Sequence, residues 1–167
     1  MAWEIDLRKA YDMIDWSFLT SMLENLKFPS KRGLRQGDPL SPFLFTIAVE
    51  CLSRMMQRLN KAVGFYFHSK CQRIKLSHIM FADDLILFSS GRNSAAGAIK
   101  EVVSNFLECS GLSINFQKSN LFMGGMSEGK VAWVEGIIGT KASPLPVRYL
   151  GLPLTSRSLS RKDCDPY

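Results

Sequence analysis

Long apolar runs and closely spaced cysteines are missing from this chain of 167 residues, and residues 1–9 lack the pattern that is typical of a leader peptide. Thr46 and Glu50 interrupt the longest apolar candidate, residues 42–52, which is shorter than the roughly 18 residues of a membrane helix. Glu4 and Asp6 stand where a secretory leader carries basic residues. The four cysteines lack zinc-ribbon spacing and read as reduced thiols. These absences predict an intracellular protein with no membrane partner.

The composition is that of a folded domain with a basic excess. Apolar residues make up 46% and charged residues 22%, which is enough apolar surface for a core and fits one domain of this length. Lys and Arg number 21 against 15 Asp and Glu, a net charge of +6. Such an excess suits a protein that binds a polyanion, although a basic domain without such a partner has the same composition.

Hydrophobic periodicity predicts strands and helices in mixed order. We expect helices over 12–27, 41–60, 94–110 and 127–138, with Gly111 and Gly139 ending the last two. We expect strands over 3–7, 112–122 and 148–154, and hairpins over 64–76 and 79–88. This order predicts an α+β fold in which helices cover one face of a mainly antiparallel sheet.

Two adjacent carboxylates, Asp83 and Asp84, lie between two apolar arms. Because Asp tolerates positive φ, we expect this pair to occupy a tight turn. A hard cation such as Mg²⁺ favours carboxylate ligands, and two-metal sites take them from different elements, which would include Asp6 if its strand is a neighbour. The alternative is a solvated turn. Asp12 and Asp15 read as helix caps.

Five sequence blocks, in one order, resemble the motifs of non-LTR (LINE-type) retrotransposon reverse transcriptases. The first is Asp6-Leu7-Arg8-Lys9-Ala10-Tyr11-Asp12, and the third is Phe81-Ala82-Asp83-Asp84. The others are Arg32-Gly33-Leu34-Arg35-Gln36-Gly37-Asp38-Pro39-Leu40-Ser41-Pro42, then Gly111-Leu112-Ser113-Ile114-Asn115 with Lys118-Ser119, and Tyr149-Leu150-Gly151. The resemblance implies the polymerase palm, a small antiparallel sheet backed by helices.

The resemblance also implies a reaction and its metal ligands. A primer 3′-hydroxyl attacks the α-phosphate of a dNTP on an RNA template, and pyrophosphate leaves. Asp6 and Asp83 correspond to ligands of two Mg²⁺ ions, with Mn²⁺ as an alternative, and Asp84 to a weaker contact. The main chain of Leu7 corresponds to a further metal ligand.

Other positions correspond to contacts with the nucleotide or the nucleic acid. Tyr11 matches the residue that excludes a ribose hydroxyl, although a core aromatic side chain is the alternative. The remaining nucleotide contacts are Gln36, Gly37 and Lys118, and the nucleic-acid contacts are Arg32, Arg35, Leu150 and Gly151. A helix-entry loop and solvated surface are the alternatives for these positions.

The chain departs from the family pattern in three places. By comparison with the family pattern, we expect the fingers region before Asp6 and the thumb after Gly151 to be absent, and a segment of several tens of residues to be deleted between Lys31 and Arg32. We therefore expect residues 2–154 to form a truncated palm with a polar tail over 155–167, and its independent activity to be impaired or lost. Alternatives are a non-catalytic nucleic-acid-binding remnant, an RNA-dependent RNA polymerase and an unstable product. Target-primed reverse transcription would imply a nuclear location.

Overall fold

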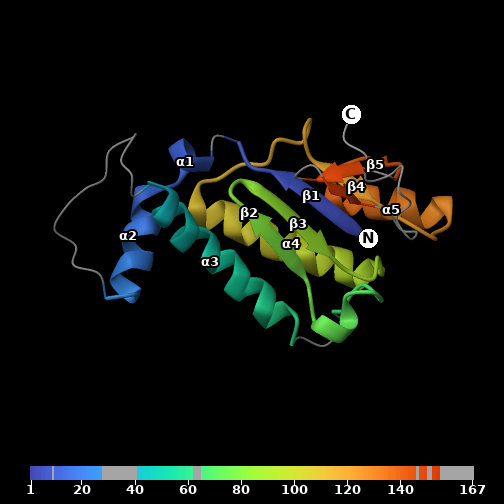
Figure 1. The fold of residues 1–167 in the computed structure, drawn as a ribbon, viewed down its shortest axis with the longest axis horizontal. Coiled ribbons are helices and arrows are strands. Elements are labelled where there is room, and N and C mark those ends of the chain that lie inside the picture. Colours follow the sequence, from blue (N-terminus) through green and yellow to red (C-terminus); the bar gives the residue numbers. More distant parts are fainter. Residues whose placement is uncertain (9, 28–40, 62–64, 146, 150–151, 155–167) are drawn as a thin grey trace.

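The computed structural model describes residues 1–8, 10–27, 41–61, 65–145, 147–149 and 152–154 (Figure 1). Its helices are α1 (Ala10–Met13), α2 (Trp16–Asn25), α3 (Ser41–Leu59), α4 (Asn93–Ser110) and α5 (Glu128–Ile138), with a 3₁₀ turn, η1 (Gln72–Ile74). Its strands are β1 (Ala2–Asp6), β2 (His78–Phe81), β3 (Asp84–Phe88), β4 (Asn120–Phe122), β5 (Ala142–Ser143), β6 (Val147–Tyr149) and β7 (Leu152–Leu154). The predicted α+β class is confirmed.

Strand β1 is the centre of a five-stranded sheet with the order β2-β3-β1-β4-β5. It pairs antiparallel with β3 on one side and with β4 on the other, whereas β4 and β5 run parallel. The sheet is therefore mixed, although its first four strands are antiparallel as predicted. In place of the single last strand that the sequence predicts, β6 and β7 form a separate antiparallel pair.

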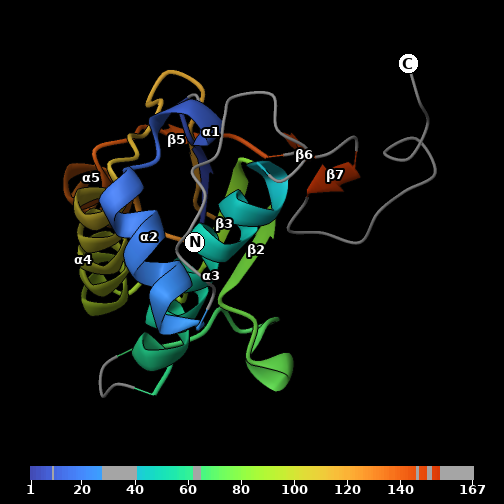
Figure 2. The same ribbon diagram turned by 90° about the vertical axis from the view of Figure 1, so that its left-hand side faces the viewer.

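The two faces of the sheet differ in what covers them. Along β1 the burial alternates, so that Trp3 and Ile5 point into the core while Glu4 and Asp6 point to the opposite, half-buried face. Figure 2 shows α4 and α5 on one side of the sheet and the β6–β7 pair on the other. Asp6 therefore lies on the face opposite to the one that packs against α4 and α5.

The long helices form where the apolar periodicity predicts them. Buried side chains repeat along α3, α4 and α5 and pack on Trp3 in one core: Phe45, Val49, Leu52, Met56, Ala95, Ile99, Val103, Phe106, Val134 and Ile138. The Asp15 carboxylate accepts the Phe18 N–H at 3.0 Å and caps α2, as predicted. Gly111 ends α4 with φ +72°, a conformation that costs glycine little.

The hairpin predicted over 64–76 is wrong within the described residues. Residues 65–77 contain turns and η1 and no strand, and Lys75 has a left-handed φ of 52°. The segment is held by single backbone bonds, such as Ser90 N–H to the Tyr66 carbonyl oxygen at 2.9 Å and Phe88 N–H to that of Ser77 at 2.7 Å. None of the described helices is long and apolar enough to cross a membrane.

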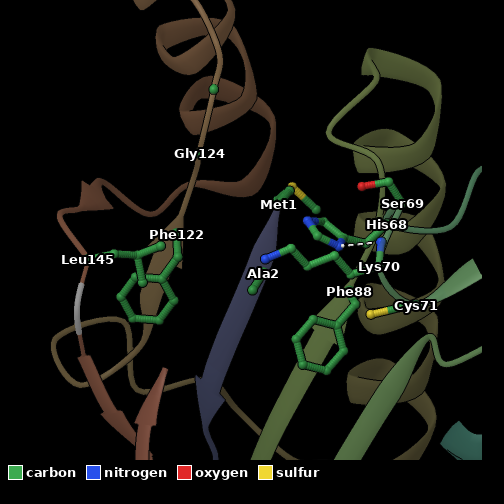
Figure 3. A pocket seen from close by; sticks show the side chains of 11 residues that line it. Met1, Ala2, His68, Ser69, Lys70, Cys71, Phe88, Phe122, Gly124 and Leu145 are labelled. Atoms are coloured by element: carbon green, nitrogen blue, oxygen red, sulfur yellow. Dashed lines mark hydrogen bonds between the residues drawn. The ribbon is translucent and has the colours of Figure 1, made fainter. Parts of the chain in front are cut away.

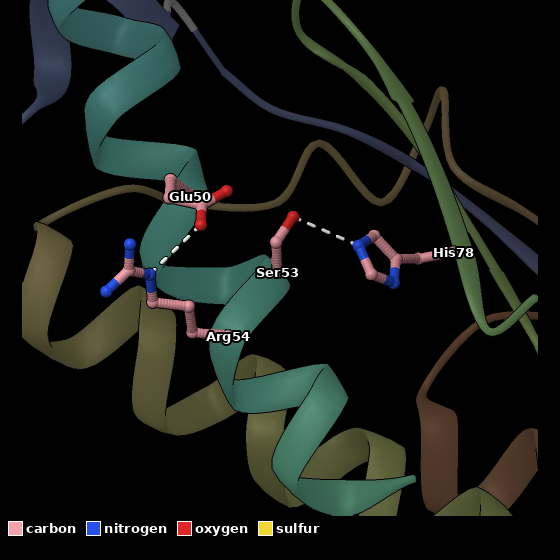
Figure 4. A network of polar contacts seen from close by, with 4 residues as sticks. All are labelled: Glu50, Ser53, Arg54 and His78. Atoms are coloured by element: carbon pink, nitrogen blue, oxygen red, sulfur yellow. Dashed lines mark hydrogen bonds and ion pairs between the residues drawn. The ribbon is translucent and has the colours of Figure 1, made fainter.

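A polar network ties α3 to the edge strand β2 (Figure 4). The His78 ring lies 3.0 Å from the Ser53 hydroxyl and 3.1 Å from that of Ser77. Burial lowers the pKa of His78, and the carboxylate of Glu50 partly opposes this shift. The fold therefore favours the neutral ring.

His78 should make the stability of the protein depend on pH. Because its folded-state pKa lies below the usual value, its contribution is complete above that value and is lost as the pH falls through the lowered pKa. Thermal unfolding between pH 7.5 and 5 should show a falling midpoint, with a shallower fall in His78→Asn. Burial also lowers the pKa of His68, so part of the pH dependence of the midpoint should remain in both proteins. Equal slopes would contradict a half-buried, neutral His78.

Candidate active site

The acidic turn connects β2 to β3 through only two residues, Ala82 and Asp83. Phe81 and Asp84 pair across the base of this turn, so Asp84 is the first residue of β3 and not a turn residue. The positive φ falls on Ala82, at 52°, whereas the sequence predicts it for the aspartates. A positive φ at the first turn position alone is the type II′ pattern, which suits the twist of an antiparallel hairpin.

Asp6 lies directly opposite Asp84 in the register of β1 with β3. The Asp6 N–H donates to the Ser119 hydroxyl at 3.1 Å, and its carbonyl oxygen accepts the Asn115 N–H at 2.9 Å, so both point away from β3. Asp6 and Asp84 are therefore a non-hydrogen-bonded pair, in which the Cα atoms approach to about 4.5 Å. This places two carboxylates side by side on the face opposite to α4 and α5.

The electrostatics of the turn follow from this proximity. Burial raises the pKa of Asp84, and the negative charges of Asp83 and then Asp6 raise it further. Within the described residues, however, no group of three or more His, Cys, Asp or Glu side chains is placed to hold a metal ion. The negative charges of Asp6 and Asp83 therefore act on Asp84, but the three side chains do not form a three-ligand metal site in the described structure.

Removing the Asp84 charge should stabilise the metal-free protein. A raised carboxyl pKa means that stability falls as the pH rises through that pKa, so the ionised Asp84 is destabilising near neutral pH. Asp84→Asn should raise the unfolding midpoint at pH 7.5 in EDTA by about 1–3 °C, because solvent screens a half-buried group. Calorimetry checks this, with the exposed Glu101→Gln as an unchanged control. A lowered midpoint for Asp84→Asn would contradict it.

The block at 111–119 holds the end of β1 in place. Leu7 bridges Ile114, and the Arg8 N–H donates to the Ser113 carbonyl oxygen at 2.9 Å. Since Asp6 and Arg8 both bond toward this block, the Leu7 carbonyl oxygen between them is directed to the other edge, where β3 begins. The Leu7 oxygen therefore lies toward the acidic turn.

Ser119 belongs to the fourth sequence block, but the sequence assigns it no role of its own. Its side chain is buried, accepts the Asp6 N–H and donates to the Asn115 carbonyl oxygen at 2.9 Å. Its place in that block, directly before the strand Asn120–Phe122, is the sequence signal for this site residue. Lys118, beside it, is exposed in the turn that precedes β4, so the structure places this predicted residue near the end of β1.

Tyr149 is a second residue whose contact with the acidic turn no sequence pattern predicts. Its hydroxyl donates to the Asp84 carbonyl oxygen at 3.3 Å, which brings β6 against the acidic end of the sheet. Burial raises the Tyr149 pKa, and the negative charges of Asp84 and Glu4 raise it further. The Tyr149 hydroxyl therefore lies beside β3, where the negative charges of Asp84 and Glu4 act on it.

The structure places only part of the predicted nucleotide and nucleic-acid contacts. Tyr11 belongs to α1, the first helix after β1, but its side chain lies outside the described part of the structure. The remaining predictions also lie outside the described residues: Arg32, Arg35, Gln36, Gly37, Leu150 and Gly151. These seven contacts stay predictions.

Residues 1–154 match the protein family described as reverse transcriptase (RNA-dependent DNA polymerase). The chain belongs to this family. The match covers more than half of the chain and includes the sheet, the acidic turn and the block that holds Asp6. The α+β structure, with Asp6 and Asp84 paired at the end of a helix-backed sheet, agrees with a reverse transcriptase palm.

Similar proteins come from retrotransposable elements. The chain is 29% identical over 149 residues to the Pol polyprotein of the type-2 element R2DM of Drosophila melanogaster, covering 84% of this chain and 13% of that protein. It is 25% identical over 133 residues to that of a type-1 R2 element of Nasonia vitripennis, covering 62% of this chain and 12% of that protein. An uncharacterized mitochondrial protein of Arabidopsis thaliana is 45% identical over 64 residues, or 36% of this chain and half of that protein.

These relatives support the non-LTR type that the motif order indicates. The chain spans only about an eighth of the length of the two R2 polyproteins. For this chain, the activity, substrates and partners of a whole reverse transcriptase are therefore a proposal.

Proposed function

We propose that this chain carries the nucleotidyl-transfer centre of an RNA-directed DNA polymerase, built on a palm over residues 2–154. The observation that carries the proposal is the register of β1 with β3, which sets Asp6 opposite Asp84 with Asp83 in the adjoining turn. In the reaction, the primer 3′-oxygen loses its proton and bonds to the α-phosphorus of a dNTP. The bond from that phosphorus to the bridging oxygen breaks, and pyrophosphate leaves.

The donor set suits divalent cations that are shared with the substrate. Mg²⁺ commonly takes one or two protein carboxylates and completes its shell with water and substrate phosphates. Asp6 and Asp83 would be the principal ligands, with Asp84 and the Leu7 carbonyl oxygen beside them, and Mn²⁺ could replace Mg²⁺. When bound, the ions would activate the attacking oxygen and stabilise the leaving one. After burial, the negative charges of Asp83 and Asp6 raise the Asp84 pKa, and bound cations would offset this repulsion between the carboxylates.

The other residues of the chain would position the reactants. Ser119 and Asn115 fix the backbone of Asp6, and Tyr149 fixes the start of β3. From the family resemblance, Tyr11 would exclude a 2′-hydroxyl from the sugar pocket. Three further residues would contact the nucleotide, and four the template and primer: Gln36, Gly37 and Lys118, then Arg32, Arg35, Leu150 and Gly151. The RNA template, DNA primer and dNTP, and a nuclear place of action, belong to this proposal.

Primer extension tests the function. The purified chain receives an RNA template with an annealed DNA primer, Mg²⁺ and either dNTPs or NTPs. Because the palm is truncated, the proposal predicts impaired extension, which is slow but depends on dNTPs and is abolished by EDTA. Preferred use of NTPs would indicate an RNA-dependent RNA polymerase. Salt-sensitive binding of the primed template without extension would overturn the proposal in favour of a non-catalytic binding remnant.

A further inference from the structure

The net positive charge of the chain comes from one segment. Residues 51–82 contain six Lys or Arg and no Asp or Glu, and the rest of the chain contains fifteen of each sign. The whole net charge of +6 therefore belongs to this segment. Charge segregation of this kind creates a local positive field, which attracts polyanions.

Part of this segment lies at the end of the sheet opposite to the acidic turn. Phe65 is buried in the core, and the Tyr66 carbonyl oxygen accepts the Ser90 N–H at 2.9 Å. Residues 65–71 therefore run beside the start of β1, where Ala2 lies, and Asp6 is at its other end. Four residue steps along the strand separate Ala2 from Asp6 by about 13 Å.

Two adjoining cavities open there, with volumes of about 560 and 520 Å³. They share the lining residues Met1, His68, Ser69, Gly124 and Gly125. Figure 3 shows the first of them, with Phe88 and Phe122 on either side of β1 and Lys70 beside His68. Among the described residues that line the two cavities none carries a carboxylate, and the three aspartates of the active site lie elsewhere.

Each of the two linings carries one cationic side chain of Lys or Arg together with aromatic rings. Lys70 is exposed at the first cavity, and Arg92 is exposed at the second. The Arg92 guanidinium carbon lies 4.0 Å from the centre of the Tyr66 ring, whose residue is 44% exposed. The pKa of His68 is lowered by burial and then by positive charge from the amino terminus and Lys70.

This combination fits phosphates joined to accessible bases. Cationic side chains follow a phosphate backbone, and exposed aromatic rings stack on bases that are not paired in a duplex. Gly125 has a φ of +70° and open space around the position of a Cβ, so the backbone allows a close approach there. A duplex hides its bases and would offer none of them to the Tyr66 ring.

We propose that the cleft formed by these two cavities, with Lys70, Arg92 and Tyr66, binds a single-stranded segment of nucleic acid. The site lies apart from the acidic turn and does not depend on polymerase activity or on metal. RNA and DNA share the chemistry that the cleft recognises, so the experiment includes both.

Binding of a labelled oligonucleotide of about ten nucleotides tests the proposal, measured by fluorescence anisotropy in EDTA over a range of salt concentrations. The double variant Lys70→Gln/Arg92→Gln should bind at least about tenfold more weakly. Its plot of the logarithm of the binding constant against the logarithm of the salt concentration should have a slope less negative by about 1.4. Each phosphate contact to a single strand contributes about −0.7 to this slope, and the variant loses two. Tyr66→Ala should weaken binding about fivefold or more.

The matched control is Lys27→Gln/Lys130→Gln, which removes the same charge from exposed positions just after α2 and on α5. It should bind within about twofold of the unmodified chain, because distant screened charges contribute little. Asp6→Asn should bind like the unmodified chain, which separates this site from the proposed active site. Three results would each overturn the proposal. The Lys70→Gln/Arg92→Gln variant could bind as tightly as the unmodified chain, the control could lose as much affinity as that variant, or a duplex could bind as tightly as a single strand. A difference between RNA and DNA arms identifies the preferred strand.

Discussion

Asp83→Asn and Asp6→Asn should each reduce primer extension by about a thousandfold or more, because each would remove a charged ligand of the proposed metal centre. The loss should appear mainly in the extension rate, since the primed template is held by other residues. Single-turnover extension at saturating dNTP measures this rate directly. Asp84→Asn should cause a smaller loss, as the weaker contact.

Glu101→Gln is the matched control for these variants. It also replaces a carboxylate by an amide, but on the exposed surface of α4. Its extension rate should equal that of the unmodified chain. Extension by Asp6→Asn at the unmodified rate would contradict the pairing of Asp6 with the acidic turn as the source of catalysis.

Trp3→Ala should cost about 3–5 kcal/mol of the free energy of unfolding, the range for large aromatic side chains in cores. Trp3 is fully buried at the centre of β1, between Leu87 of β3 and Leu121 of β4. Its loss leaves a cavity on the strand that joins the two halves of the five-stranded sheet. Urea unfolding followed by circular dichroism measures the change.

Trp133→Ala removes the same atoms from the surface of α5, where Trp133 is 46% exposed. It should change the free energy of unfolding by less than about 1 kcal/mol, as surface substitutions usually do. Similar losses for the two variants would contradict a core centred on β1. A Trp3→Ala variant without a cooperative transition would show that this strand is needed for folding.

Local signals in the sequence predict most of the helices and the acidic turn. Helix α4 carries a complete apolar stripe and a terminal glycine, so the sequence marks both its face and its end. The arms around Asp83 and Asp84 are apolar and short, which is typical of a hairpin. The same signals place Asp6 close to the turn only on the condition that β1 and β3 are neighbours, which the sheet order confirms.

Register and loop structure depend on contacts that local patterns do not contain. The partner of Asp6 is Asp84 because Ala82 takes the positive φ and shifts the turn by one residue, a choice that depends on strand twist. The segment 65–77 carries strand-forming side chains, but in the described structure it contains no strand and forms turns instead. Ser119 and Tyr149 act through contacts 113 and 65 residues away along the chain.

Binding of Mn²⁺ in the presence of primed template and a non-hydrolysable dNTP tests the proposed centre most directly. It measures whether the metal ions bind, whereas primer extension measures only the activity that they would support. Electron paramagnetic resonance counts the bound ions. We predict two ions for the unmodified chain and for Glu101→Gln, and weakened binding with at least one ion lost in both Asp6→Asn and Asp83→Asn. Unchanged stoichiometry and affinity in these two aspartate variants would contradict a metal centre formed by β1 and the acidic turn.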